Sequence, residues 1–334
     1  MNILLIQLKR IGDLVLTTPA IAALREKFPE AKISLVVSPG CAELLPAISK
    51  IDNKLVVNNM ASWLEITRTG FDYTIDFTRN DRSSFLTRLS RAKTRIASER
   101  RKQKSTFRSR AYNTFVAAKL KQLHTVDYNL KLLEPLGIGD QAPPIQLKIP
   151  EAARKKAKEL RTKRKIEKQF IVFHPGSARA EKFWEADRWA DVIAHAPNDC
   201  AIVLTGGASS LEQNHLREIK SKLRRKIVDL SDQTDLLTLA ALISQARLLV
   251  TVDSAPMHFA AAARIPQIAL FGPTNPFHWR PRDTPALILQ GASTTPLQDF
   301  SPDQPRVPMK QISTQAVIDA MNALLSSPRP QRFA

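Results

Sequence analysis

The sequence predicts an α/β protein made of two Rossmann-like halves, each built around a doubly wound parallel sheet. Its 334 residues fit two domains of about 150 residues each better than one core. Short apolar runs alternate with helical patterns in both halves, which is typical of parallel strands joined by crossover helices. Three prolines between residues 142 and 150 indicate a linker. We therefore expect domains over residues 1–150 and 151–334.

The first half opens with a βαβ pattern. The apolar run at residues 3–8 predicts a buried strand. Thr18 as N-cap, followed by Pro19, predicts the start of a helix that ends before Pro29. Further strands are expected at residues 32–37, 54–57 and 73–77.

The second half repeats this alternation more regularly. Strands are expected at residues 170–174, 201–204, 226–230, 248–252 and 267–271. Helices are expected at residues 187–195, from 210, at 236–244 and from 255. This succession predicts an open doubly wound sheet. A last helical pattern at 314–325 is a candidate to pack back on the first domain.

The positive charge of the chain is concentrated in two stretches. At a net charge of +19, the chain should attract nucleic acid, an anionic membrane surface or acidic substrates. Residues 154–168 hold nine Lys/Arg against two carboxylates, and we interpret them as a solvated amphipathic helix. Residues 79–110 hold twelve against two, and apolar side chains lie between their charges. They predict a surface for a ligand that is charged and partly apolar, with Phe85, Leu86, Leu89, Phe107 and Tyr112.

Several classes of protein are disfavoured. No recognition motif accompanies the charge, so we do not expect nucleic-acid binding. No G-x-G-x-x-G follows the first strand, which disfavours a dinucleotide-dependent oxidoreductase. No apolar run approaches roughly 18 residues and no signal pattern opens the chain, so we expect a cytoplasmic protein. Cys41 and Cys200 match neither a disulfide framework nor a metal site and are interpreted as buried thiols.

The loops after the strands are the candidate functional sites, because doubly wound sheets bind ligands at the carboxyl ends of their strands. After the first strand, Gly12 allows a tight turn that brings Asp13 to this edge. A lone carboxylate there could act as a general base, but an aspartate near a helix start also commonly caps that helix. The spacing alone favours neither interpretation.

Two loops of the second half have unusual chemistry. Lys182 follows the turn at residues 174–177 and is a plausible phosphate clamp. Gly206 and Gly207 allow a ligand to approach the backbone closely, although the pair is not a full dinucleotide motif. Ser209 and Glu212 form the S-x-x-E pattern of a capping box, which we favour over a nucleoside contact by Glu212.

The sharpest signal is the stretch VTVDSAPMHFAAAA at residues 250–263. A buried strand ends at Asp253, and Ser254 is expected to cap the next helix. The free N–H groups and dipole of that helix would form an anion site. His258, one turn later, could hydrogen-bond a phosphate or a sugar hydroxyl. The residues from Gly272 to Thr274 supply another turn at the same edge.

These motifs resemble glycosyltransferase family 9, the ADP-heptose:lipopolysaccharide heptosyltransferases. The resemblance runs over nearly the whole chain. It rests on ILLIQLKRIGDLVLTTPAIAALREKFP, FHPGSARAEKFWEADRWADVI and VDSAPMHFAAAARIPQIALFGPTNPFHWRP. The DSAPMH core and the later HWRP are most similar to the heptosyltransferase III branch. The family implies a GT-B fold, in which two Rossmann-like domains face each other across a cleft, an inverting reaction, no catalytic metal and no cofactor.

The resemblance also implies a role for each candidate. Asp13 matches the family's general base. The implied donor-binding residues are Lys182, Asp253, Ser254 and His258. The turns and the helix start add further donor-binding candidates: Ser177, Gly206, Gly207, Ala255, Gly272 and Thr274. The implied acceptor-binding residues are Arg10, Arg79, Arg100, Arg101 and Lys102.

The implied substrates are ADP-heptose and the anionic inner core of lipopolysaccharide. Peripheral contact with the inner face of the cytoplasmic membrane is compatible with the positive charge. Some family members carry an acidic nucleoside contact soon after the glycine pair, where Ser209 or Ser210 stands here and Glu212 is the nearest carboxylate. The alternative is a family 9-like transferase that uses another nucleotide sugar for a different surface glycan.

Overall fold

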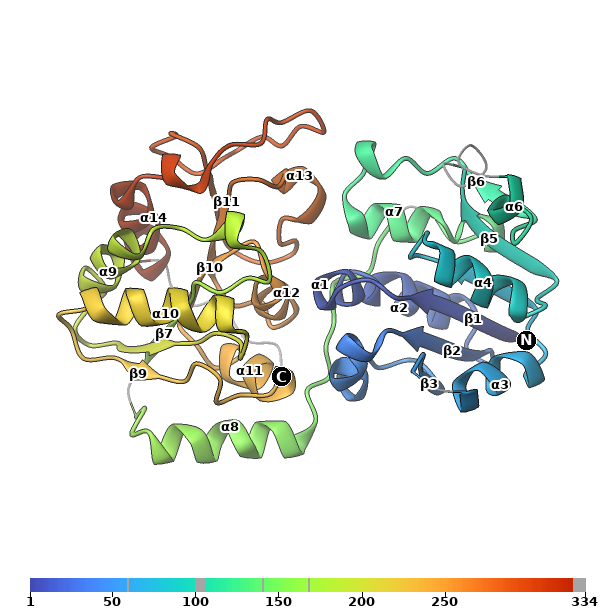
Figure 1. Ribbon diagram of the computed structural model, residues 1–334, viewed down its shortest axis with the longest axis horizontal. Coiled ribbons are helices and arrows are strands. Elements are labelled where there is room, and N and C mark those ends of the chain that lie inside the picture. The colour runs from blue at the N-terminus through green and yellow to red at the C-terminus, as the bar shows by residue number, and fades with distance from the viewer. Residues whose placement is uncertain (59, 100–105, 140, 168, 327–334) are drawn as a thin grey trace. The chain divides into compact units, whose positions relative to one another are not determined.

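The computed structural model describes residues 1–334 except 59, 100–105, 140, 168 and 327–334 (Figure 1). The chain divides into two compact units, Met1–Lys148 and Ile149–Ala334. The division falls inside the proline-containing stretch that suggested a linker. Each unit has its own six-stranded parallel sheet and its own apolar core.

The sheet of the first unit has the strand order β3-β2-β1-β4-β5-β6, with every pair parallel. Its central strand pairs with both halves of the sheet, because Ile3 lies opposite Ile33 on one side and Tyr73 on the other. The strands are β1 (Asn2–Gln7), β2 (Lys32–Val37), β3 (Asn53–Val56), β4 (Tyr73–Asp76), β5 (Thr94–Ser98) and β6 (Thr114–Val116).

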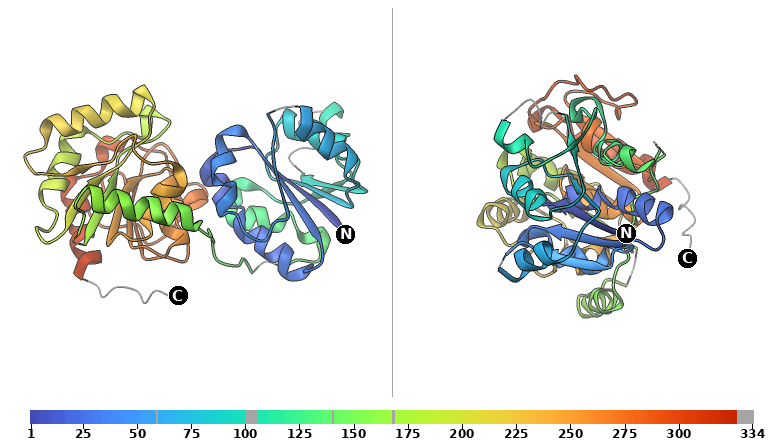
Figure 2. Two further views of the ribbon diagram at one scale, coloured as in Figure 1. Left: turned by 90° about the horizontal axis from the view of Figure 1, so that it is seen from below. Right: turned by 90° about the vertical axis from the view of Figure 1, so that its right-hand side faces the viewer.

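Helices cover this sheet on both faces (Figures 1 and 2). Ile66 of α3 and Leu86 of α4 pack with Leu4 and Ile6 of β1 in one core cluster, while α2 packs against α7. The helices are α1 (Ile11–Val15), α2 (Thr18–Lys27), α3 (Met60–Arg68), α4 (Asp81–Leu89), α6 (Thr106–Ser109) and α7 (Thr125–Lys131). Short 3-10 turns are η1 (Pro39–Ala47), η2 (Leu120–Gln122) and η3 (Glu134–Leu136).

The start of α2 differs from the prediction. Thr18 was expected as the N-cap, but Thr17 occupies that position and Pro19 is the second helical residue. The short helix α1 runs almost directly into α2, and Thr17 Oγ1 donates a hydrogen bond to the Asp13 carbonyl at 2.8 Å. The Thr17 hydroxyl therefore closes α1 and does not cap α2.

The sheet of the second unit has the order β12-β11-β10-β7-β8-β9 and is also entirely parallel. Counted along the chain, its strands occupy the same positions as those of the first sheet. The strands are β7 (Phe170–His174), β8 (Ala201–Leu204), β9 (Val228–Asp229), β10 (Leu248–Val252), β11 (Gln267–Phe271) and β12 (Ala286–Gln290). The predicted alternation of the second half is therefore confirmed.

The core of the second unit contains the largest buried side chains of the described chain, Trp184 and Trp189. The last helix contributes Val317 and Met321 to this core and contacts α9, β11 and β12, while its packing on the first domain stays a prediction. The helices and 3-10 turns are α8 (Glu151–Lys163), η4 (Ala180–Lys182), α9 (Ala186–Ala194), α10 (Ser210–Lys222), α11 (Leu236–Ile243), α12 (Ala255–Ala262), α13 (Pro276–Trp279), η5 (Met309–Gln311) and α14 (Thr314–Ser326).

The two basic stretches differ in structure. Helix α8 buries Ala153 and Ala157 and exposes most of its cations, so the prediction of a solvated helix is confirmed. Among the described apolar candidates of the first stretch, Leu86 and Tyr112 are buried, Leu89 is half-buried and Phe85 is exposed. The expected ligand surface of interleaved apolar side chains is therefore wrong for Leu86 and Tyr112, because they pack in the core.

Both cysteines are free and buried, as predicted. Within the described part of the chain, no helix combines the length and the apolar character that crossing a bilayer requires.

Candidate active site

Both sheets have a topological switch point, where neighbouring strands lead away in opposite directions. In the first sheet it lies between β1 and β4, and in the second between β7 and β10. Ligands of doubly wound sheets bind outside the carboxyl ends of the strands at such points. The loops after these four strands carry Asp13, Arg79, Lys182 and Asp253. These four predicted polar residues thus lie at the switch point of their own sheet.

Asp13 lies in the short helix α1, directly after β1. Its carboxylate is 3.7 Å from Lys9 Nζ, and the two side chains are 19% and 21% exposed. The N-cap position of α1 belongs to Arg10, so the interpretation of Asp13 as a helix cap is wrong. Because 3.7 Å is longer than a hydrogen bond, Asp13 has a cationic neighbour but no tight partner in this pair.

Lys9 is a candidate that the sequence reasoning missed. Burial lowers the pKa of the Lys9 ammonium, Asp13 raises it and nearby Arg79 lowers it. Lys9 therefore lies among the charged residues that follow β1 and β4. Lys9 could have been found in the sequence because it precedes Asp13 by four residues, a separation at which side chains meet across one helical turn.

Arg79 is held in an uncommon backbone conformation by a buried carboxylate. Its φ of 65° lies in the left-handed region. Asp76 Oδ1 accepts the Arg79 backbone N–H at 3.1 Å, while Oδ2 accepts hydrogen bonds from Ser83 Oγ and Tyr112 OH. The Arg79 guanidinium lies 4.8 Å from the ring centre of Tyr128. Strain of this kind persists only where the surroundings fix the residue, and here they fix Arg79 beside the end of β1.

Lys182 and Asp253 form a short buried ion pair in the second unit. Lys182 Nζ donates to Asp253 Oδ2 at 2.6 Å and to the Asp253 carbonyl at 2.9 Å. Thr274 Oγ1 donates to the same carboxylate oxygen at 2.7 Å. An ammonium has three hydrogens, so one remains for a ligand after these two bonds. The sequence predicted all three as donor-binding residues, but not that they would bind one another.

The start of α12 has the N–H groups that the sequence predicted, with a different capping pattern. Ser254 occupies the N-cap position, but its side chain donates to the Val252 carbonyl at 3.3 Å and makes no capping hydrogen bond. The predicted N-cap position of Ser254 is therefore confirmed, without a capping hydrogen bond from its side chain. The N–H groups of the first turn, which begins at Ala255, have no side-chain cap and suit an anion. His258 is buried one turn later.

Two glycine turns approach the carboxylate of Glu212. A Cβ on Gly207 would lie 2.4 Å from one carboxylate oxygen, and a Cβ on Gly176 would lie 2.3 Å from the other. Ser209 Oγ accepts the Glu212 N–H at 3.3 Å, so the predicted cap by Ser209 is confirmed. The Glu212 carboxylate accepts from Ser209 Oγ at 3.2 Å, which differs from the backbone contact of a full capping box. Burial raises the pKa of Glu212. Ser209 is thus the capping residue, and Glu212 is a half-buried carboxylate beside the turns.

His174 is the last residue of β7, and its side chain is buried. Its Nδ1 lies 2.9 Å from Thr205 Oγ1, and burial lowers its pKa to about 4. The imidazole is therefore neutral at pH 7. Sequence reasoning placed His174 in a turn and assigned it no role.

The remaining predicted residues fall into three groups. Gly206 and Gly272 have packing reasons to be glycine, since a Cβ would meet Leu216 at 2.4 Å and Met309 at 2.6 Å. Ser177 is buried in the loop after β7, and Arg10 is exposed. Three predicted acceptor residues lie outside the described residues: Arg100, Arg101 and Lys102.

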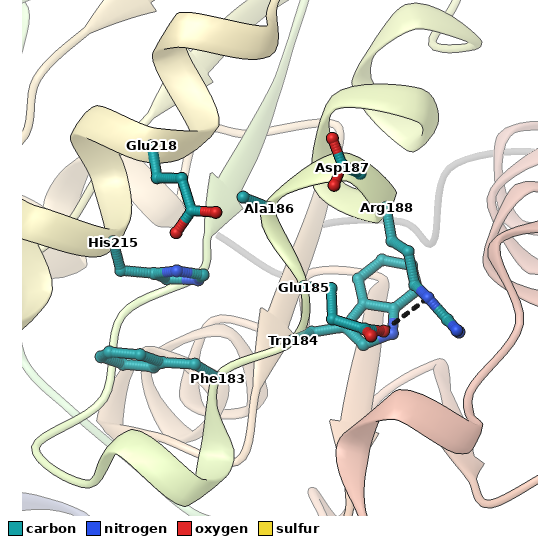
Figure 3. A pocket seen from close by; sticks show the side chains of 8 residues that line it. All are labelled: Phe183, Trp184, Glu185, Ala186, Asp187, Arg188, His215 and Glu218. Carbon is teal, nitrogen blue, oxygen red and sulfur yellow. Dashed lines mark ion pairs between the residues drawn. The ribbon is translucent and has the colours of Figure 1, made fainter.

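A separate pocket of about 420 Å³ lies beside the loop that carries Lys182 (Figure 3). His215 stacks on Phe183 at one end, with ring centres 4.3 Å apart, and Glu185 pairs with Arg188 at the other. None of the predicted donor-binding residues lines this pocket. Its lining consists of Phe183, Trp184, Glu185, Ala186, Asp187, Arg188, His215 and Glu218. Among the described residues, no group of three or more His, Cys, Asp or Glu side chains could hold a metal ion.

Comparison with known proteins relates this architecture to one family. The family model described as glycosyltransferase family 9 (heptosyltransferase) matches residues 60–305. The chain belongs to glycosyltransferase family 9. One family 9 relative, lipopolysaccharide heptosyltransferase 3 of Escherichia coli strain K12, is 30% identical over 284 residues, covering 81% of this chain and 82% of its own.

Solved structures of family 9 proteins share the fold. A glycosyl transferase family 9 structure from Veillonella parvula has a TM-score of 0.83 at 23% identity, covering 97% of both chains. The structure of Escherichia coli heptosyltransferase WaaC with ADP has a TM-score of 0.72 at 21% identity, also covering 97% of both chains. The expected α/β class and GT-B fold, with two Rossmann-like domains, are thereby confirmed.

Proposed function

We propose that this family 9 protein transfers heptose from ADP-heptose onto the anionic inner core of lipopolysaccharide. The observation that carries the proposal is the 30% identity, over most of both chains, to a lipopolysaccharide heptosyltransferase. The ADP in the solved WaaC structure supports an adenosine-diphosphate donor. No cofactor is proposed, because the nucleotide sugar is itself a substrate. We place the reaction in the cytoplasm.

The second unit is proposed to hold the donor diphosphate. Lys182 keeps one ammonium hydrogen for a phosphate oxygen, while Asp253 fixes its position with two hydrogen bonds. The uncapped N–H groups at the start of α12 add partial positive charge at the end of the neighbouring strand. Both features stabilise the charge that develops on the departing ADP, so the proposed mechanism is metal-independent.

The first unit is proposed to supply the base and the acceptor contacts. Asp13 accepts the proton of the acceptor hydroxyl as its oxygen bonds to the anomeric carbon of heptose and the bond to ADP breaks. A single displacement from the opposite face inverts the anomeric configuration. Arg79, whose backbone is fixed by Asp76 after the neighbouring strand, is proposed to contact an acidic group of the acceptor.

Calorimetry with a panel of nucleotide sugars tests the donor assignment. We expect ADP-heptose to bind more tightly than ADP-glucose, UDP-glucose and GDP-mannose, with ADP alone retaining part of the affinity. The bound sugar is then supplied with heptose-deficient lipopolysaccharide core, and product formation is followed by mass spectrometry. Tighter binding and transfer of another sugar would replace this proposal by the alternative family 9-like transferase.

A further inference from the structure

We propose that the exposed faces of α3 and α4 dock the first unit onto an anionic lipid bilayer. The docking patch consists of an apolar centre, Met60, Trp63, Leu64 and Phe85, and a basic rim, Arg68, Arg82 and Arg88. The choice of a bilayer rests in part on the proposed function, because a lipopolysaccharide acceptor is carried on a membrane.

Three of the four side chains in the apolar centre are largely exposed to solvent. Met60, Leu64 and Phe85 are 73%, 43% and 57% exposed, and they are three of the five large apolar side chains that are exposed among the described residues. Trp63 joins the two helices, since its ring centre lies 5.4 Å from that of Phe85. Clustered exposed apolar side chains of this kind mark an interaction surface.

Helical geometry separates the docking face from the core face. On α3, residues 60, 63, 64 and 67 lie on one side of the helix, while Ile66 packs into the core. On α4, Phe85 points outward, whereas Leu86 and its buried neighbours face the sheet. Trp63 also packs against the core cluster, whereas the exposed Met60, Leu64 and Phe85 are left for a partner.

The charges around the apolar centre are mostly positive. Arg68, Arg82 and Arg88 are exposed, and the Arg82 guanidinium is anchored by a hydrogen bond to the Val57 carbonyl. Asp81 is paired with Arg108, which leaves Glu65 as the exposed carboxylate on these two helices without an ion pair. Apolar side chains can enter the headgroup region while the cations contact lipid phosphates, and tryptophan favours this interface.

The position of the patch agrees with a lipid-borne acceptor. Helix α4 follows β4 and the Arg79 turn directly, so the patch belongs to the same unit as Asp13 and the proposed acceptor contacts. Nucleic acid would use the cations but not Met60 and Leu64, because neither has a ring on which bases stack. The combination of apolar centre and basic rim therefore favours a bilayer.

Vesicle sedimentation of the full chain tests the proposal. We expect binding to vesicles of phosphatidylglycerol and phosphatidylcholine, and little binding to phosphatidylcholine alone. Replacing both Leu64 and Phe85 by serine should weaken the partition coefficient about tenfold or more, and Arg68→Gln with Arg88→Gln should do the same. The matched control is Lys155→Gln with Lys158→Gln on α8, which removes two exposed cations elsewhere and should change partition less than about threefold.

A second measurement reports insertion at the patch itself. Trp184 and Trp189 are fully buried, and the half-buried Trp279 lies in the second unit, so lipids with brominated acyl chains should quench mainly the fluorescence of Trp63. Trp63→Phe should remove most of that quenching and leave sedimentation largely intact. Equal losses in the α8 control, or unchanged binding of the Leu64/Phe85 double variant, would overturn the proposal. The proposal would also be overturned if the wild-type protein were an oligomer in solution and the Leu64/Phe85 double variant a smaller assembly, because the patch would then be a protein interface.

Transfer to a lipid-free core oligosaccharide separates this inference from the proposed function. The docking variants should keep wild-type transfer rates with that acceptor, because none of their substitutions touches Asp13 or Lys182. A wild-type protein that binds the vesicles but transfers no heptose would contradict the proposed function and leave the docking surface standing.

Discussion

Each unit has a lysine and an aspartate at the switch point of its sheet, and the two pairs differ in distance and burial. Lys182 and Asp253 are 2.6 Å apart and 10% exposed, whereas Lys9 and Asp13 are 3.7 Å apart and about twice as exposed. A short buried pair fixes both charges, while a loose pair leaves its carboxylate able to accept a proton. The same two residue types thus suit charge stabilisation in one unit and base chemistry in the other.

Replacing Asp13 by asparagine should have the largest effect of the changes that probe this comparison. We expect transfer to fall at least about 10²-fold, the low end for the loss of a general base, with ADP binding unchanged. The free energy of unfolding should change by less than about 1 kcal/mol, because Asp13 has only a loose, partly exposed partner. Single-turnover transfer and urea denaturation measure the two quantities.

The matched control for this substitution is Asp319→Asn on α14, an exposed aspartate far along the chain from both pairs. It should alter neither transfer nor stability. Near wild-type transfer by Asp13→Asn would show that the loose pair in the first unit has no catalytic role.

Replacing Lys182 by alanine should destabilise the protein by about 3 kcal/mol, because it leaves the Asp253 carboxylate buried without its cation. The sequence alone gave no reason to expect this loss of stability. Donor binding should also weaken. Denaturation and calorimetry at low temperature, where the variant is still folded, separate the two effects.

A double variant tests whether the buried pair is the cause. Lys182→Met combined with Asp253→Asn removes both charges and should recover much of the lost stability, while donor binding stays weak. If the double variant is no more stable than Lys182→Ala, packing around Lys182 and not the unpaired Asp253 determines the loss.

The two central strands also end differently, and this predicts a pH effect. The first ends at neutral Gln7 and the second at buried His174, whose pKa is lowered from 6.5 to about 4. Because the unfolded chain takes up this proton first, the folded protein loses about 3 kcal/mol as pH falls from 6.5 to 4. His174→Gln should flatten that part of the stability profile, measured by urea denaturation across the range. An unchanged slope would mean that other groups produce the acid sensitivity.

The sequence predicted the alternating strands and helices and most residues at the switch points, because these depend on local patterns such as apolar runs and helix starts. It did not predict which of those residues pair. Lys182 and Asp253 are 71 residues apart, and their contact exists only because β7 and β10 are neighbours in the sheet. The burial of Tyr112 was missed for the same reason, since its partner Asp76 lies on β4, 36 residues earlier in the chain. The basic stretch at residues 79–110 was visible in the sequence. The apolar residues of α3 that complete the docking patch lie outside that stretch, so the charge pattern did not reveal them.

Replacing Lys9 by methionine should have the smallest effect, and it tests the loose pair directly. Burial lowers the pKa of Lys9 below the unfolded value of 10.5, so the unfolded chain holds this proton to higher pH than the folded protein does. Charged Lys9 therefore costs stability below its folded pKa, and the cost disappears as the pH rises to 10.5. Lys9→Met removes that cost together with the weak attraction to Asp13. The free energy of unfolding at pH 7 should change by no more than about 1 kcal/mol, against about 3 kcal/mol for Lys182→Ala. Paired denaturation curves at pH 7 and near pH 10 measure the difference, and a loss as large as that of Lys182→Ala would show that both units hold their lysine equally tightly.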